Sequence, residues 1–358
     1  MDTINLTKRK IGKGQPTYVI AEIGINHNGR LNLARELVER SVEAGADAVK
    51  FQKRDAASMM IASKINQNPV GRLSKATDDI LEGAPEFGNW SYPDIRLELS
   101  DENYYELKKL ADKLNVDFFA SSWDNKSTDF LVNLGVQLLK IPSVEIKNPS
   151  YLEYVAKTKL PIIMSTGTAD IHEVDRAVSI IRQYNPELCL LQCTSAYPSR
   201  FDQIDLRVIE TLRDRYHLPV GYSGHELSMH VPVAAVALGA CVIEKHVTLN
   251  RKMNGPDQSA SIEMHELKEM VRQIREIELA LGTPEKKHHA SEDALVRVLG
   301  KSVVSAVRIP ANTVLTREML VTKGPSTGIP ASDMHSLIGK RAIRDIETDS
   351  LIMPDQIA

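Results

Sequence analysis

Short apolar runs alternate with amphipathic stretches along the first 283 residues of the chain. The pattern predicts eight β-strands separated by helices, an order typical of a parallel sheet covered by helices. Eight parallel strands fit a closed (β/α)8 TIM barrel, so we expect a barrel over residues 1–283. The predicted strands are 18–22, 48–52, 118–121, 138–143, 162–165, 188–194, 220–223 and 242–246.

Helical periodicity is clearest in three of the intervening stretches. Residues 31–44 lead to Gly45, and residues 101–114 place their leucines on one face. Residues 264–281 carry apolar side chains at helical spacing and are followed by Gly282 and a proline, which predicts the helix that closes the barrel.

Three further segments depart from the alternation of strands and helices. Residues 54–99 form a long insertion after the second strand, for which an active-site lid and plain structural padding both remain open. Residues 284–298 are polar and charged and are interpreted as a linker, in which His288 and His289 are solvated. Residues 299–358 predict a compact β-rich domain, with β-type runs at 302–307 and 342–346.

Composition narrows the class of protein. The chain has 358 residues and a net charge of -3, so it lacks the excess of basic residues that is typical of a nucleic-acid-binding protein. Its three cysteines do not form a disulfide framework. Its first residues have no signal-peptide core, and no run is long enough to span a membrane. We therefore expect a cytoplasmic protein.

The predicted strands share one property, because each ends in side chains that can hold charge, donate hydrogen bonds or bind metal. In a barrel these ends form a ring around one mouth. Lys50 and Lys140 should point into that mouth, where an anionic ligand would compensate their charge. The alternative is that they pair with Glu22, Glu145 or Glu244 as barrel filling. Neutral donors on the ring are Ser121, Ser143, Ser165, Ser195 and Ser223.

Two histidines follow neighbouring strands and suggest a metal site. His225 and His246 each stand beside a carboxylate, in the strings GHE and EKH. Two imidazoles that leave room for water and substrate suit a catalytic Mn²⁺, Co²⁺, Fe²⁺ or Zn²⁺. Cys193 has no histidine beside it in the sequence and is interpreted as a small buried residue. Rossmann, P-loop and α/β-hydrolase fingerprints are absent from the sequence.

Nine ordered strings carry a resemblance to a known family: AEIGINHNG, VKFQK, LKIPS, MSTG, LQCTSAYP, GYSGHE, EKHVTL, GPDQSAS and LGKSVVSAVRIP. From about Tyr18 to the C-terminus, the chain resembles the sialic acid synthases. The resemblance implies a TIM barrel followed by an antifreeze-like (SAF) domain, in a domain-swapped homodimer. It also implies metal-dependent condensation of phosphoenolpyruvate with an N-acylated mannosamine-type sugar, with release of phosphate through carbon–oxygen cleavage. The cation would be Mn²⁺, with Mg²⁺ or Co²⁺ also compatible.

The resemblance also assigns roles to residues. Glu22 and Glu244 would position water and handle protons, and His225 and His246 would bind the metal. Gln52, Tyr197 and Asp257 would contact the sugar, with Glu145 close by. Phosphoenolpyruvate would be held by Lys50, Ser121, Lys140, Ser143, Ser165, Ser195 and Ser223.

Two positions depart from the family pattern. Members of the family often carry an arginine in the SAF domain that reaches the sugar in the partner subunit's barrel, and here Lys323 is the cation nearest to that position. Asn312 stands where such domains usually have glycine. The first departure puts that sugar contact in doubt.

Several activities stay open at the level of sequence. The sugar can be neutral, 6-phosphorylated or a diacetamido sugar, which would give a legionaminate or pseudaminate synthase. A deoxy-octulosonate or deoxy-heptulosonate phosphate synthase would share the chemistry of phosphoenolpyruvate but lacks a C-terminal SAF domain. A barrel without catalytic activity that binds a carbohydrate also stays open.

Overall fold

The computed structural model describes residues 3–59 and 97–358. The chain divides into two compact units, Met1–Gly282 and Thr283–Ala358, which are described separately. Among the described residues, no helix is both long and apolar enough to cross a membrane.

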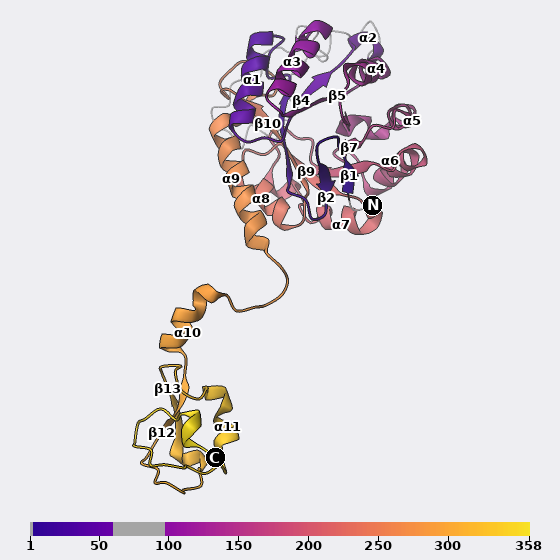
Figure 1. Cartoon of the computed structure of the whole chain (residues 1–358). Helices are drawn as coiled ribbons and strands as arrows, with labels where there is room; N and C mark the ends of the chain where they lie inside the picture. Colours follow the sequence, from indigo (N-terminus) through magenta and orange to yellow (C-terminus); the bar gives the residue numbers. More distant parts are fainter. Residues whose placement is uncertain (1–2, 60–96) are drawn as a thin grey trace. The chain divides into compact units, whose positions relative to one another are not determined.

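The first unit is a closed barrel of parallel strands surrounded by helices (Figure 1), which confirms the predicted fold class. Within the described residues, eight strands pair in chain order, and β10 pairs with both β9 and β3 to close the sheet. These strands are β3 (Tyr18–Gly24), β4 (Ala48–Lys53), β5 (Asp117–Ser122), β6 (Leu139–Ile141), β7 (Ile162–Ser165), β8 (Leu188–Cys193), β9 (Val220–Gly224) and β10 (Val242–Thr248).

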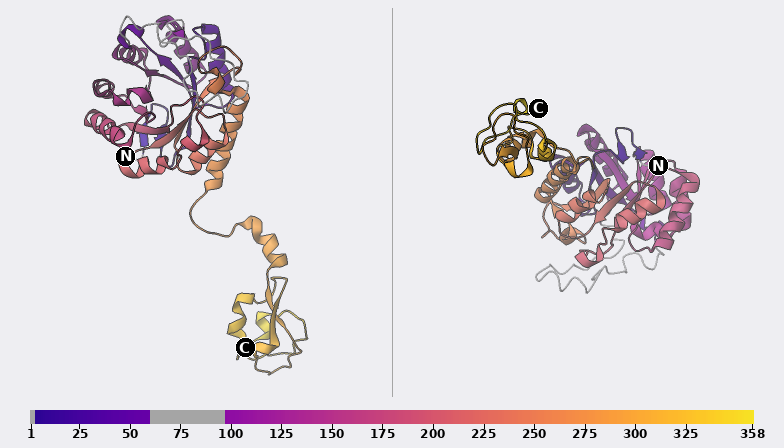
Figure 2. Two further views of the ribbon diagram at one scale, coloured as in Figure 1. Left: turned by 180° about the vertical axis from the view of Figure 1, so that it is seen from behind. Right: turned by 90° about the horizontal axis from the view of Figure 1, so that it is seen from below.

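Helices pack around the outside of the strands, as the two views in Figure 2 also show. The apolar core lies between the strands and these helices, where leucine, isoleucine and valine side chains are fully buried. The helices are α1 (Leu31–Glu43), α2 (Ala56–Met59), α3 (Asp101–Lys113), α4 (Asn125–Leu134), α5 (Pro149–Lys157), α6 (Ile171–Tyr184), α7 (Val208–Tyr216), α8 (His230–Ala237) and α9 (Met264–Leu281).

Local signals explain why several helices begin where they do. The Asp124 carboxylate accepts a hydrogen bond from the Ser127 amide at 2.7 Å at the start of α4. Asp170 and Glu173 form a reciprocal capping box at the start of α6. These caps fix the point at which the chain turns from a strand end into a helix, and hence the shape of the loops at the mouth.

Two short pairings in the first unit were not predicted. A hairpin of β1 (Thr3–Asn5) and β2 (Lys10–Gly12) precedes the barrel, and β11 (Ile262–Glu263) extends the sheet beside β10. Most of the insertion predicted at 54–99 lies outside the described residues, so its role stays open.

The second unit has its own small apolar core, formed by residues such as Val303, Leu320 and Ile352. Its sheet pairs β12 (Ser302–Ser305) with β13 (Leu320–Lys323), and the short helix α11 (Met334–Leu337) contributes Leu337 to the same core. The predicted strand 342–346 was wrong, because Ala342 and Ile346 make only isolated bridges, to Ile357 and Ile309 respectively. Asn312 adopts a φ of 68°, a left-handed conformation that asparagine tolerates.

The segment interpreted as a linker contains a helix, α10 (Asp293–Leu299). Periodicity did not reveal it, because the helix has only seven residues and its side chains are exposed. His288 and His289 are exposed, and His288 Nε2 lies 3.5 Å from Asp293 Oδ1.

Candidate active site

Strand register brings the predicted strand-end residues to one level of the barrel. Glu22 on β3 is the register partner of Lys50 on β4 and of His246 on β10. Ser121 on β5 is paired in the same way with Lys140 on β6. Parallel strands that run in register present their carboxyl ends at one face, so these side chains converge at the mouth of the barrel.

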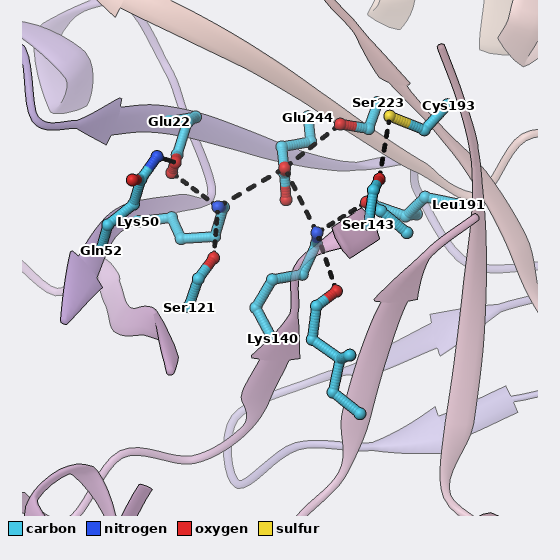
Figure 3. Close-up of polar contacts among 12 residues, drawn as sticks. Glu22, Lys50, Gln52, Ser121, Lys140, Ser143, Leu191, Cys193, Ser223 and Glu244 are labelled. Atoms are coloured by element: carbon cyan, nitrogen blue, oxygen red, sulfur yellow. Dashed lines mark hydrogen bonds and ion pairs between the residues drawn. The ribbon is translucent and has the colours of Figure 1, made fainter. Parts of the chain in front are cut away.

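Two lysines and two glutamates form the centre of the site (Figure 3). Lys50 Nζ lies 2.8 Å from Glu22 Oε2 and 3.5 Å from Glu244 Oε1. Lys140 Nζ lies 3.6 Å from the same Glu244 oxygen. All four side chains are buried. The lysines are therefore not unpaired, and of the carboxylates considered from the sequence, Glu22 and Glu244 are their partners.

Burial and mutual charge set different proton affinities for the two glutamates. Burial raises the pKa of Glu22 to about 7, against the opposing effect of Lys50 and with a contribution from Glu244. Burial also acts on Glu244, but Lys140 and Lys50 outweigh it and lower its pKa. Burial lowers the pKa of Lys140, whereas the two glutamates overcome burial and raise the pKa of Lys50. Glu22 can thus exchange a proton near neutral pH while Glu244 stays ionised.

Serine hydroxyls surround the two ammonium groups. Lys50 Nζ donates to Ser121 Oγ at 3.0 Å, and Lys140 Nζ donates to Ser165 Oγ at 2.6 Å. Ser223 Oγ donates to Glu244 Oε1 at 3.2 Å. The structure therefore brings three of the five predicted serines into direct contact with the central charges.

The remaining two predicted serines lie beside Gly167 and Cys193. A Cβ atom on Gly167 would lie 2.4 Å from Ser195 Oγ and 2.7 Å from Ser143 Oγ. Only glycine allows this approach of the backbone to both hydroxyls. Cys193 Sγ lies 3.5 Å from Ser143 Oγ and 4.0 Å from Ser195 Oγ. A compact group of hydroxyl donors results.

His225 and His246 are neighbours at the mouth, with ring centroids 5.4 Å apart. Thr194 O lies 2.8 Å from His225 Nδ1, so a proton on Nδ1 would be donated to this carbonyl and Nε2 would be left as an acceptor. Among the described residues, His246 Nδ1 is buried with no hydrogen-bond partner, and Asp257 Oδ2 lies 3.8 Å from it. Both imidazoles are buried.

This donor set fits a divalent cation at an open site. A hydrogen bond from one ring nitrogen to a backbone carbonyl is the usual contact that orients a metal-binding histidine. Buried polar atoms normally have a hydrogen-bond partner, and His246 Nδ1 has none among the described residues. Among the described residues, no cluster of three or more His, Cys, Asp or Glu side chains surrounds a possible ion. The remaining coordination positions would belong to water and substrate.

Some of the residues that the resemblance assigns to the sugar lie near these imidazoles. Gln52 Nε2 donates to Glu22 Oε1 at 3.2 Å, and the Tyr197 ring centroid lies 4.1 Å from that of His225. Burial raises the pKa of Asp257 next to His246.

Two further predicted sugar contacts lie outside this group. Glu145 is only partly buried, and its carboxylate accepts a hydrogen bond from Asn148 at 2.9 Å. Lys323 belongs to the second unit, where its ammonium group pairs with Asp349.

Sequence reasoning missed the position of Cys193. Its sulfur lies 4.0 Å from His225 Nδ1, because β8 and β9 are adjacent and Cys193 is in register with Ser223. Burial raises the pKa of Cys193, but His225 and Ser143 outweigh it and lower that pKa to about 7. Cys193 is buried as predicted, and the histidine that the sequence did not place beside it is brought near by the fold. Strand adjacency in the barrel was the signal that could have revealed the contact.

Comparison with known proteins decides the family. The NeuB family model matches residues 37–286, and the SAF domain model matches residues 300–358. The chain belongs to the NeuB family. The predicted resemblance to sialic acid synthases is therefore confirmed.

Several relatives of this NeuB-family protein are synthases of sialic acid-type sugars. It is 38% identical over 352 residues to the N,N'-diacetyllegionaminic acid synthase of Legionella pneumophila, covering 97% of this chain and 96% of the relative. It is also 38% identical to the human N-acetylneuraminate-9-phosphate synthase, over 98% of this chain and 95% of the relative. The sialic acid synthetase structure from Leptospira borgpetersenii matches with a TM-score of 0.68 and 34% identity, covering 82% of this chain and 95% of that chain.

Proposed function

We propose that this NeuB-family protein condenses phosphoenolpyruvate with an N-acylated mannosamine-type sugar and releases phosphate. The observation that carries the proposal is the buried group of Lys50, Lys140, Glu22 and Glu244 beside two imidazoles at one barrel mouth. The relatives named above support a sialic acid-type product, and neutral, 6-phosphorylated and diacetamido sugars are the acceptors to compare.

The two lysines and the serines suit the anionic substrate. The two ammonium groups lie in a buried site, where Glu244 stays ionised and Glu22 is ionised only above its pKa of about 7. Such a site favours a phosphate and a carboxylate, which are bound by point charges and hydroxyl donors. Lys140 and Lys50 would stabilise the phosphate as it leaves, with Ser121 and Ser165 fixing the two ammonium groups.

The bond changes follow from the chemistry of an enol phosphate. The methylene carbon attacks the aldehyde carbon of the open-chain sugar, which forms the new carbon–carbon bond and places positive character on the phosphate-bearing carbon. Water adds to that carbon and gives one proton to Glu22. The aldehyde oxygen, which received the electron pair of its C=O bond, takes up the proton held by Glu22 and becomes a hydroxyl group. The tetrahedral intermediate collapses to the ketone as its carbon–oxygen bond to phosphate breaks, and its hydroxyl proton leaves with the phosphate.

His225 and His246 would hold a divalent cation, with Mn²⁺ proposed and Mg²⁺ or Co²⁺ also compatible. When bound, the cation would act as a Lewis acid toward the aldehyde oxygen. Asp257 lies 3.8 Å from His246 Nδ1, and Gln52 contacts Glu22. In the proposed mechanism both would orient the sugar next to the reacting carbons.

A substrate panel tests the function. We expect the purified full-length chain to release phosphate from phosphoenolpyruvate only when Mn²⁺ and an acceptor sugar are both present. N-acetylmannosamine, its 6-phosphate and a diacetamido analogue should be compared by initial rate. Absence of phosphate release with all three sugars would contradict the proposal, and the preferred sugar would identify the product class.

The raised pKa of Glu22 predicts how the rate depends on pH. Its pKa of about 7 means that the proton-accepting carboxylate predominates above that pH, so kcat/KM should fall about tenfold per pH unit below it. Glu22→Gln should lower kcat by about 10²- to 10⁴-fold and remove this acidic limb. Phosphate-release rates between about pH 5.5 and 9 measure both effects. An unchanged acidic limb in the folded Glu22→Gln variant would assign it to another group.

Two expectations from the sequence stay predictions. The domain-swapped homodimer would give twice the mass of one chain in light scattering, and a monomer at working concentration would contradict it. Cytoplasmic localisation would be checked by cell fractionation.

A further inference from the structure

A fully buried ion pair lies next to the candidate site but contacts none of its central charges. Lys245 Nζ lies 2.7 Å from Glu226 Oε1, and the exposed fractions of the two side chains are 0% and 1%. Tyr222 Oη donates to the second carboxylate oxygen of Glu226 at 2.6 Å. We call Tyr222, Glu226 and Lys245 the Glu226 cluster. Within the described part of the chain, this is the least exposed ion pair.

The Glu226 cluster alternates in sequence with the residues of the site. Lys245 stands between Glu244 and His246 on β10, and Glu226 directly follows His225. Successive side chains of a strand point to opposite faces, so Lys245 projects away from the face that Glu244 and His246 share. Register pairs Lys245 with Gly224, which brings the ends of β9 and β10 together at this point.

Close packing fixes the cluster under the end of β9. A Cβ atom on Gly224 would lie 2.6 Å from Glu226 Oε2 and 2.6 Å from a Tyr222 ring carbon. The carboxylate of Glu226 therefore occupies the space that a side chain at position 224 would need. The backbone immediately before His225 cannot shift without disturbing this carboxylate.

The backbone on the other side of His225 is fixed by the same lysine. Lys245 Nζ donates to the backbone oxygen of Glu226 as well as to its carboxylate. The Ser199 amide donates to the backbone oxygen of His225 at 3.3 Å, and Thr194 O contacts the imidazole Nδ1. The direction of the remaining ring nitrogen, Nε2, is thereby set from several sides.

Energetics argue against a purely stabilising role for the pair. The desolvation of two buried charges offsets most of their attraction, and apolar residues of similar volume are often at least as stabilising. What the pair supplies is directional geometry, since a lysine that binds both a carboxylate and a carbonyl fixes their relative position.

We propose that the Glu226 cluster is a positioning device that holds His225 and His246 in the geometry that binds the divalent cation. The inference rests on the metal site of the proposed function. It assigns to Glu226, Lys245 and Tyr222 no contact with substrate, and their effect is exerted through the backbone of the two strand ends.

The test compares Mn²⁺ binding by the wild-type chain with binding by a double variant that carries both Glu226→Leu and Lys245→Met. Both proteins are first freed of metal with a chelator. Free Mn²⁺ is measured by electron paramagnetic resonance during titration. Loss of contacts that orient metal-binding side chains costs about 10- to 100-fold in metal affinity, so we expect a dissociation constant raised by that factor. The thermal unfolding temperature should stay close to that of the wild type.

A matched control is the partly exposed ion pair of Arg215 on α7 and Asp175 on α6, at 2.7 Å. The variant Arg215→Gln, Asp175→Asn should bind Mn²⁺ as the wild type does. Tyr222→Phe provides a second variant that retains the ion pair and the ring. It removes only the 2.6 Å hydrogen bond, and we expect its Mn²⁺ affinity to fall by about 2- to 10-fold.

The outcomes separate the positioning role from the metal site itself. Wild-type affinity in the folded double variant would overturn the proposal while leaving the metal site intact. A wild-type chain that fails to bind Mn²⁺ would overturn both. If the double variant does not fold, Tyr222→Phe decides, because unchanged Mn²⁺ affinity in that variant would overturn the proposal.

Discussion

Lys140→Met is expected to lower kcat/KM for phosphoenolpyruvate by about 10³-fold while the barrel stays folded. The ammonium group is buried, 2.6 Å from Ser165 Oγ and 3.6 Å from Glu244, so methionine would remove a positive charge that stabilises the leaving phosphate. Glu244 keeps Lys50 at 3.5 Å, so the substitution leaves no carboxylate without a cation nearby. Phosphate release at varied phosphoenolpyruvate concentration measures the loss.

Lys157→Met on α5 is the matched control, because that lysine pairs with Glu153 on the exposed surface. It should retain wild-type kinetics. A fall of less than about tenfold in folded Lys140→Met would contradict the role of Lys140 in phosphate departure, since a buried charge of this kind contributes more. Lys50→Met is a less informative variant, because it removes the cation that lies 2.8 Å from Glu22, and leaving a buried charge unpaired costs about 3–5 kcal/mol of stability.

His225→Ala and His246→Ala are each expected to abolish Mn²⁺-dependent turnover, with a loss of about 10³-fold or more. Each removes one of the two imidazoles whose ring centroids lie 5.4 Å apart at the mouth. A single remaining histidine, with water, holds a divalent cation weakly, so Mn²⁺ affinity should fall together with the rate. Phosphate release during Mn²⁺ titration, with direct binding by electron paramagnetic resonance, measures both.

His172→Ala is the control for these variants, because its side chain is 82% exposed on α6. It should bind Mn²⁺ and turn over as the wild type does. Removal of metal with a chelator should abolish phosphate release by the wild type, and added Mn²⁺ should restore it. Wild-type metal dependence in either His225→Ala or His246→Ala would remove that histidine from the proposed metal site.

Much of the site could be predicted because a closed barrel converts position along the chain into position in space. Once the eight apolar runs are recognised, the residues that end them must share one mouth. Two lysines and two glutamates meet there, and the ammonium nitrogens lie no more than 3.6 Å from the carboxylate oxygens with which they pair: Glu22, Lys50, Lys140 and Glu244. The pattern also indicated three long helices close to their observed bounds, such as 264–281 for α9.

Contacts across neighbouring strands could not be read from the chain. Cys193 and His225 are 32 residues apart, and only the register of β8 with β9 places their side chains 4.0 Å from each other. The Lys245–Glu226 pair was not predicted for a related reason, because charged residues at strand ends are expected to face the mouth and this lysine faces the other way.

The sequence by itself determined the family, the barrel and the chemical types gathered at its mouth, because apolar periodicity and strand-end residues are local properties of the chain. Tertiary structure decided which charges compensate one another and how each proton is held. Burial and distance act between strands, so they raise the pKa of Glu22 to about 7 and keep Glu244 ionised between two lysines. Those differences between otherwise identical carboxylates exist only once the barrel has closed.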